Sequence, residues 1–311
     1  MRTNFAPFSA FGLVVLLLLA GCGSSSSGSA TTEKPLIARD ANGTTIAIPA
    51  TAPQRIISLG ATDSEILGAL GLEARVVGVD AFTDYPASLT SKTKVTDPNG
   101  KANIEQIIAL HPDLVLSFGG ETADTDRQLM QNNLTVVDLP AGGVDESLTE
   151  IRLVGQLTHA ESAANSLVNG MQQRINAVTQ KAATAPKVTV YMEVGFSPPP
   201  PFAYGGGSFG DDLITAAGGT NIFASDTANG GFPQVSEEDI IKDSPQVIIL
   251  TEDPQFGGDP TQVAKRPGWS QIAAVQNHRV YAINPDLAER PGPRMVDALE
   301  QLAKDLHPEL F

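Results

Sequence analysis

From Arg55 onward, short apolar runs alternate with helical patterns, and this alternation leaves few folds open to the chain. Buried strands are predicted at four places: Ile56–Leu59, Val76–Val79, Leu114–Phe118 and Thr135–Asp138. Helices are predicted between them: one that begins after Thr62, then Ile104–Leu110 and Ala123–Asn132. A βαβα order of this kind predicts a mainly parallel sheet covered by helices on both faces.

A long helical region follows, from about residue 146 to 184, and a second series of strands and helices comes after it. We expect the Thr158-His159 step to divide the region, because one apolar face then repeats at helical spacing: Ala164, Leu167, Val168, Met171, Ile175 and Val178. The second series is predicted as Val188–Met192, Asp211–Ala217, Val247–Leu250, Val280–Ile283 and Arg294–Leu306. The predicted fold class is therefore α/β, with two Rossmann-like lobes joined by one long α-helix.

Two segments, one from each lobe, also resemble each other. Residues 104–116 and 238–250 both read as a helix, a proline and a strand. This similarity suggests that the lobes are of related build. We assign residues 36–158 to an N-terminal lobe, 159–185 to the linker helix and 186–311 to a C-terminal lobe, with a hairpin at Leu36–Pro49 turning at Asn42-Gly43.

The N-terminus is typical of a targeting segment. The apolar run Phe11–Ala20 is too short to span a bilayer comfortably and ends at Leu19-Ala20-Gly21-Cys22, which resembles a bacterial lipobox. We predict a signal peptide at 1–22, lipidation of Cys22 and a Ser/Gly-rich tether at 23–35. The alternative is an ordinary signal peptide with a chance cysteine. Lipidation would place the protein outside the cytoplasm, in the periplasm or on the outer cell surface, anchored to a membrane without a spanning helix of its own.

Composition excludes several functions. Cys22 is the only cysteine, so no intramolecular disulfide can form. A net charge of −15 disfavours nucleic acid as a partner and disfavours long-range steering of a strongly anionic ligand. The four histidines lack the spacing of metal ligands, and we predict no metal site, no cofactor and a monomer.

A series of ordered motifs resembles the substrate-binding proteins of ABC importers, in the class III branch that serves iron-siderophores, haem and cobalamin. The motifs run from about residue 53 to 306 and include Pro53–Leu59, Asp84-Tyr85-Pro86, Gly218–Phe223, Pro233–Ser236, Pro267-Gly268-Trp269 and Arg290–Arg294. The resemblance implies two α/β lobes with a ligand cleft between them, and a permease dimer with its ATPase subunits as partner. The cleft loops lack the Trp common in this family, and Trp269 is expected to pack the fold.

The resemblance also implies permease docking by an exposed Glu at the tip of each lobe. Glu65 and Glu238 match these positions, with Glu237 as a neighbour that complicates the assignment. A structural role competes with docking in both places. Thr62 and Glu65 could form a capping box, and so could Ser236 and Asp239, in which case Glu238 is not needed for the cap.

The ligand is predicted to be a corrinoid, with a ferric siderophore or haem as the alternative. The predicted ligand contacts are Tyr85, Phe118, Phe202, Tyr204, Phe232 and Arg290; Phe82 and Phe196 are further candidates. Anionic ferric catecholates need clustered cations, and the cations plausibly near the cleft are Lys101, Arg266, Arg290 and Arg294. Haem needs an axial Tyr or His, and Tyr85 or Tyr204 could serve.

An enzymatic function has one motif in its favour. Gly206–Gly210 matches the G-x-S-x-G nucleophile elbow around Ser208, with His278 and His307 downstream. The elbow requires a strand that leads directly into the serine, and the proline-rich residues 198–205 make a poor strand. We therefore expect Ser208 to cap the following helix, predict no catalytic residues, and keep a serine hydrolase as a remote alternative.

Overall fold

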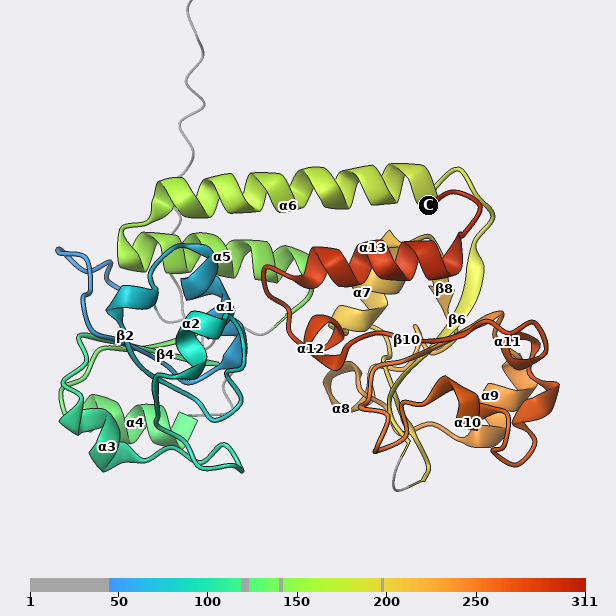
Figure 1. Cartoon of the computed structure of the whole chain (residues 1–311), viewed down its shortest axis with the longest axis horizontal. Coiled ribbons are helices and arrows are strands. Elements are labelled where there is room, and N and C mark those ends of the chain that lie inside the picture. The colour runs from blue at the N-terminus through green and yellow to red at the C-terminus, as the bar shows by residue number, and fades with distance from the viewer. Residues whose placement is uncertain (1–44, 119–122, 140–141, 197–198) are drawn as a thin grey trace, which may run out of the picture. The chain divides into compact units, whose positions relative to one another are not determined.

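The structure is a computed structural model that describes residues 45–118, 123–139, 142–196 and 199–311. The predicted signal peptide, lipidation site, tether and hairpin turn lie outside the described residues. We call the part built on the first sheet the N-lobe and the part built on the second the C-lobe (Figure 1).

The N-lobe is built on a five-stranded parallel sheet with the strand order β3-β2-β1-β4-β5. Its strands are β1 (Ile56–Ser58), β2 (Val76–Val79), β3 (Thr93–Lys94), β4 (Leu114–Phe118) and β5 (Val136–Leu139). Its helices are α1 (Ala61–Ala69), α2 (Ala87–Thr90), α3 (Ile104–Ala109), α4 (Ala123–Gln131) and α5 (Val144–Thr158), with a 3₁₀ turn at Glu73–Arg75. The central strands are buried apolar runs, as a sheet covered on both faces requires. The predicted parallel sheet is confirmed.

The C-lobe sheet has the order β10-β9-β6-β7, and β8 also pairs with β6. Its strands are β6 (Val188–Gly195), β7 (Phe202–Ala203), β8 (Gly219–Asn221), β9 (Val247–Leu250) and β10 (Val280–Ala282). Its helices are α7 (Phe209–Ala216), α8 (Ala228–Gly231), α9 (Glu237–Asp243), α10 (Pro260–Val263), α11 (Ala273–Gln276), α12 (Pro285–Ala288) and α13 (Met295–Leu306), with a 3₁₀ turn at Trp269–Gln271. Only the β6–β7 pair is antiparallel among these described strands.

Helix α6 (Glu161–Ala182) joins the two series of elements. It packs against α5 of the N-lobe and against α13 and α7 of the C-lobe (Figure 1). The predicted break before it is confirmed, because α5 ends at His159 in the left-handed region, with φ of 55°. A Cβ atom at Gly155 would come within 2.4 Å of the Ala164 side chain, so this glycine lets α5 and α6 approach closely.

The similarity between residues 104–116 and 238–250 extends to backbone geometry. Helices α3 and α9 are each followed by a residue of positive φ directly before a proline: His111 (47°) before Pro112 and Ser244 (42°) before Pro245. The next strand lies beside the first strand of its own sheet in both lobes. The lobe boundaries given above stay predictions, but α3 and α9 occupy equivalent positions.

Candidate ligand-binding site

The first cavity lies at the carboxyl end of the N-lobe sheet, where open parallel sheets bind ligands. It has a volume of about 480 Å³. The residues that line it follow β1, β2 and β3 or end β4, together with one residue of α4: Leu59, Gly60, Ala61, Asp80, Phe82, Asn99, Gly100, Lys101, Ala102, Phe118 and Thr125. Phe82 is 53% exposed, which leaves it accessible to a ligand.

The second cavity, of about 700 Å³, lies at the corresponding end of the C-lobe sheet. It is lined by residues that follow β9 and β10 and by one N-lobe residue: Glu252, Asp253, Phe256, Asn284, Pro285, Asp286, Glu289 and Asp84. Phe256 is 60% exposed here. Since Asp84 belongs to the N-lobe, both lobes contribute to this cavity.

Acidic groups dominate the second cavity. Burial raises the pKa of Glu252, and burial together with the charge of Asp286 raises the pKa of Glu289 to about 7. Burial also raises the pKa of Asp286. Lys101 is the only Lys or Arg among the described residues that line either cavity. The lining therefore has a surplus of negative charge.

The other cations considered from sequence are committed to ion pairs. Arg266 donates to both carboxylate oxygens of Glu193 at 2.7 and 2.8 Å, and its guanidinium lies 3.7 Å from the Phe196 ring centroid. Arg294, which is the N-cap residue of α13, donates to both oxygens of Glu65 at 2.8 and 2.5 Å. Arg290, a predicted ligand contact, is held by three acids described below. These arginines are therefore not free to neutralise an anionic ligand.

The predicted aromatic contacts divide into three groups. Phe118 lines the first cavity. Phe202 and Phe232 are partly exposed, and Tyr85 is exposed with its ring 4.2 Å from the Arg294 guanidinium. Tyr204, in contrast, is buried in the core and donates to the carbonyl of Ala288 at 3.3 Å, so its assignment as a ligand contact is corrected.

Sequence reasoning missed Phe256 and the acidic wall of the second cavity, which Glu252, Asp286 and Glu289 form. Phe256 lies in a loop that has no periodic pattern, and Glu252 and Glu289 are far apart in the chain. The sequence offered one signal: Glu252 lies two residues after the end of a buried strand, where parallel sheets bring functional groups together.

The structure corrects the placement of Glu65. The N-cap residue of α1 is Gly60 and it makes no side-chain cap, so Thr62 and Glu65 form no capping box. The Glu65 side chain is only 1% exposed and paired with arginines of the C-lobe. It does not lie on an exposed tip, which is what docking to a permease would require.

The motif Ser236–Asp239 at the start of α9 has the helix cap that its sequence predicts. The Ser236 hydroxyl accepts from the Asp239 amide at 3.1 Å and caps α9, which leaves Glu238 exposed and outside the cap. Glu237 has a different role, since it accepts a hydrogen bond from Nε1 of Trp269 at 2.8 Å. Trp269 is fully buried, as expected for a residue that packs the fold.

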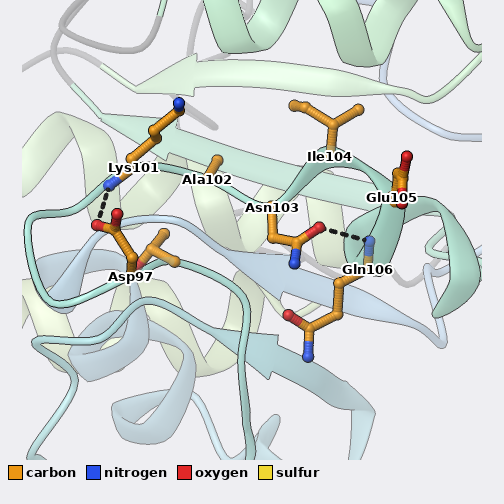
Figure 2. Close-up of a pocket in the computed structure, with 8 residues that line it drawn as sticks. Asp97, Lys101, Ala102, Asn103, Ile104, Glu105 and Gln106 are labelled. Carbon is orange, nitrogen blue, oxygen red and sulfur yellow. Dashed lines mark hydrogen bonds between the residues drawn. The ribbon is translucent and has the colours of Figure 1, made fainter.

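The N-lobe carries an equivalent exposed acid that sequence reasoning did not select. Asn103 caps α3 by accepting from the Gln106 amide at 3.1 Å, and Glu105 lies exposed in the first turn, as Glu238 does in α9. Glu105 lines a groove of about 440 Å³ whose lining also includes Asp97 and Lys101 (Figure 2).

Ser208 is a helix cap, as predicted. Its buried hydroxyl accepts from the Asp211 amide at 3.2 Å and donates to the Gly205 carbonyl at 2.7 Å. The residues before it form turns and no strand that leads into the serine. The geometry of a nucleophile elbow is therefore missing from this described segment.

Two sheets that each carry a cavity at their carboxyl end, bridged by one long helix, define a two-lobed solute-binding protein. The sequence model of the periplasmic binding protein family matches residues 56–287. The chain belongs to the periplasmic binding protein family.

Several relatives match over most of the chain. An uncharacterized ABC transporter substrate-binding lipoprotein, YvrC of Bacillus subtilis (strain 168), is 34% identical and covers 96% of both chains. The vitamin B12-binding protein of Vibrio cholerae serotype O1 is 29% identical, over 80% of this chain and 87% of that protein.

Solved structures agree with this assignment. The periplasmic vitamin B12 binding protein BtuF of Vibrio cholerae matches with a TM-score of 0.70 and 28% identity, over 83% of this chain and 98% of that one. A possible iron-binding (periplasmic solute-binding) protein from Staphylococcus epidermidis ATCC 12228 matches with a TM-score of 0.72 and 29% identity, over 83% and 100%. The predicted family and two-lobed fold are confirmed.

Proposed function

We propose that the protein captures a corrinoid outside the cytoplasm and delivers it to the permease of an ABC importer. The observation that carries the choice of ligand is the surplus of acids over cations in the two cavities. A corrin ring is rimmed with amides, whose N–H groups can donate to Glu252, Asp286 and Glu289. Its apolar faces suit the exposed rings of Phe82 and Phe256. The similarity to vitamin B12-binding proteins supports the same ligand.

The alternative ligands differ in charge. Ferric catecholates and haem carry negative charges that this lining would repel, since Lys101 is the only cation among the described residues that line the two cavities and Arg290 is already paired with Asp84 and Asp286. Haem also needs an axial Tyr or His, and none occurs among the described residues that line the two cavities. An uncharged ferric hydroxamate is compatible with the lining. The similarity to a possible iron-binding protein makes it the second candidate.

A competition experiment tests the choice of ligand. The purified chain is mixed with equimolar cyanocobalamin, haem, a ferric catecholate and a ferric hydroxamate, then desalted, and its absorbance spectrum is recorded. We expect the corrin bands to be retained at one equivalent. Retention of an iron-chelate spectrum without corrin bands would overturn the ligand and leave the transport role intact.

Docking to the permease is proposed for Glu238 together with Glu105. Both are exposed acids in the first turn of equivalent helices, and neither belongs to its helix cap. Charges placed this way fix orientation and association rate more than total affinity. Glu65 is no longer proposed for this role, because its carboxylate is buried in ion pairs.

Anchoring through Cys22 is part of the same proposal. The lipobox motif supports it, and so does the similarity to a substrate-binding lipoprotein. No helix within the described residues is long and apolar enough to cross a membrane.

A further inference from the structure

The C-lobe turn between α12 and α13 is fastened to the N-lobe by charged groups. Arg294, at the end of this turn, donates through Nε and Nη2 to the two carboxylate oxygens of Glu65 in α1, at 2.8 and 2.5 Å. Nη1 of Arg290 lies 3.5 Å from the same carboxylate. One buried acid of the N-lobe is therefore shared by two arginines of the C-lobe.

A second set of contacts surrounds this pair. Arg290 also donates to Asp84 of the N-lobe at 2.5 and 3.2 Å and pairs with Asp286 at 2.8 Å. The Tyr85 ring lies 4.2 Å from the Arg294 guanidinium. The turn passes close to α1, since a Cβ atom at Gly292 would lie 3.3 Å from the Thr62 side chain. The contact is thus bidentate, stacked and closely packed.

These contacts are connected to the ligand cavity. Asp84 and Asp286, which Arg290 holds together, both line the second cavity, one from each lobe. If the turn separates from α1, the two walls of this cavity separate as well. The Glu65 side chain is 1% exposed, and separation of the turn would remove both of its arginine partners. A buried charge would then lack compensation, so the paired arrangement is strongly preferred.

We propose that Glu65, Arg290 and Arg294 form an ionic clasp between the lobes that sets the width of the ligand cleft. They act as positioning residues that hold Asp84 and Asp286 at a fixed separation. The inference rests on the proposed function for its biological meaning. The clasp itself is a property of the protein without ligand.

Distance measurements by pulsed electron paramagnetic resonance test the clasp directly. Spin labels are placed on the full chain at Gln128→Cys in α4 and Lys242→Cys in α9, which are both exposed and lie in different lobes. Cys22→Ser removes the native thiol. We expect Glu65→Gln to at least double the width of the distance distribution measured without ligand.

Arg294 provides the variants that separate positioning from folding. Arg294→Gln should broaden the distribution as Glu65→Gln does, whereas Arg294→Lys, which keeps the charge, should restore much of the narrow distribution. Arg174→Gln is the matched control, because it breaks exposed ion pairs to Asp297 and Glu300 and neither pair involves a side chain of the clasp. The control should leave the distribution unchanged.

The outcomes are distinguishable from those of the ligand experiment. An unchanged distribution in folded Glu65→Gln or Arg294→Gln overturns the clasp, whichever ligand binds. Equal broadening in Arg174→Gln also overturns it, since loss of any arginine would then have the same effect. If Glu65→Gln does not fold, the clasp is tested by comparing the distance distributions of Arg294→Gln and Arg294→Lys.

Discussion

Two adjacent acids in the first turn of α9, Glu237 and Glu238, have separate roles. Glu237 accepts from Nε1 of the fully buried Trp269, whereas Glu238 is exposed. Glu237→Ala leaves the indole N–H without its partner and should lower the free energy of unfolding by about 1–3 kcal/mol. Glu238→Ala should change it by less than about 0.5 kcal/mol. Denaturant unfolding of both variants checks this, and equal losses would contradict the separation of roles.

Docking through Glu105 and Glu238 gives a second prediction for single residues. Ligand-stimulated ATP hydrolysis by the cognate importer should fall in Glu105→Ala and in Glu238→Ala and nearly vanish in the double variant, with ligand affinity unchanged. Added salt should weaken the single variants further, because screening reduces the remaining charge pairs.

Asp243→Ala, an exposed acid at the end of α9, is the control for that measurement and should retain full stimulation. Glu237→Ala is unsuitable as a control because Glu237 supports Trp269. Normal stimulation by the double variant would exclude these two acids as docking groups.

Helices α1 and α5 of the N-lobe bury a pair of carboxyl groups, Asp63 and Glu150. Burial raises the pKa of Asp63 in α1 and of Glu150 in α5 well above their ordinary values, and the charge of Asp80 raises that of Asp63 further. The charge of Asp63 also raises the pKa of Glu150, so the two carboxyl groups disfavour each other's ionisation. Each group binds more protons in the folded than in the unfolded state above its ordinary pKa, so stability falls as pH rises.

Removal of the proton-binding group should flatten this pH dependence. In wild type, one extra bound proton in the folded state costs about 1.4 kcal/mol per pH unit above the unfolded pKa, until the folded pKa is passed. Glu150→Gln keeps the size and polarity of the side chain and removes the titration of Glu150. Chemical denaturation between pH 5 and 9 should show a smaller slope in the variant. An equal or steeper slope would show that Glu150 does not titrate in this way.

What could be predicted from sequence depended on how local the signal was. The central strands, the break at His159 and the caps by Ser208 and Ser236 follow from apolar runs and from side chains that bond within three residues. The Glu65–Arg294 pair joins residues 229 positions apart, so local chemistry suggested a cap that does not form. Phe256 and the acidic wall were missed for the same reason.

Membrane attachment is a property of the whole molecule. Cys22→Ala should give a protein that folds and binds ligand as before but no longer enters the detergent phase in a partition assay, because the acyl chains are its proposed anchor. A variant that partitions like wild type would contradict lipidation at Cys22.

The central claim is that a corrinoid lies between the walls formed by Phe82 of one lobe and Phe256 of the other. Calorimetric titration with cyanocobalamin should show one tight site in wild type. Because a buried aromatic anchor contributes more than about 1 kcal/mol, affinity should fall at least tenfold in the Phe82→Ala/Phe256→Ala double variant. Unchanged affinity in the double variant, or a wild type that binds a ferric hydroxamate and no corrinoid, would contradict the claim.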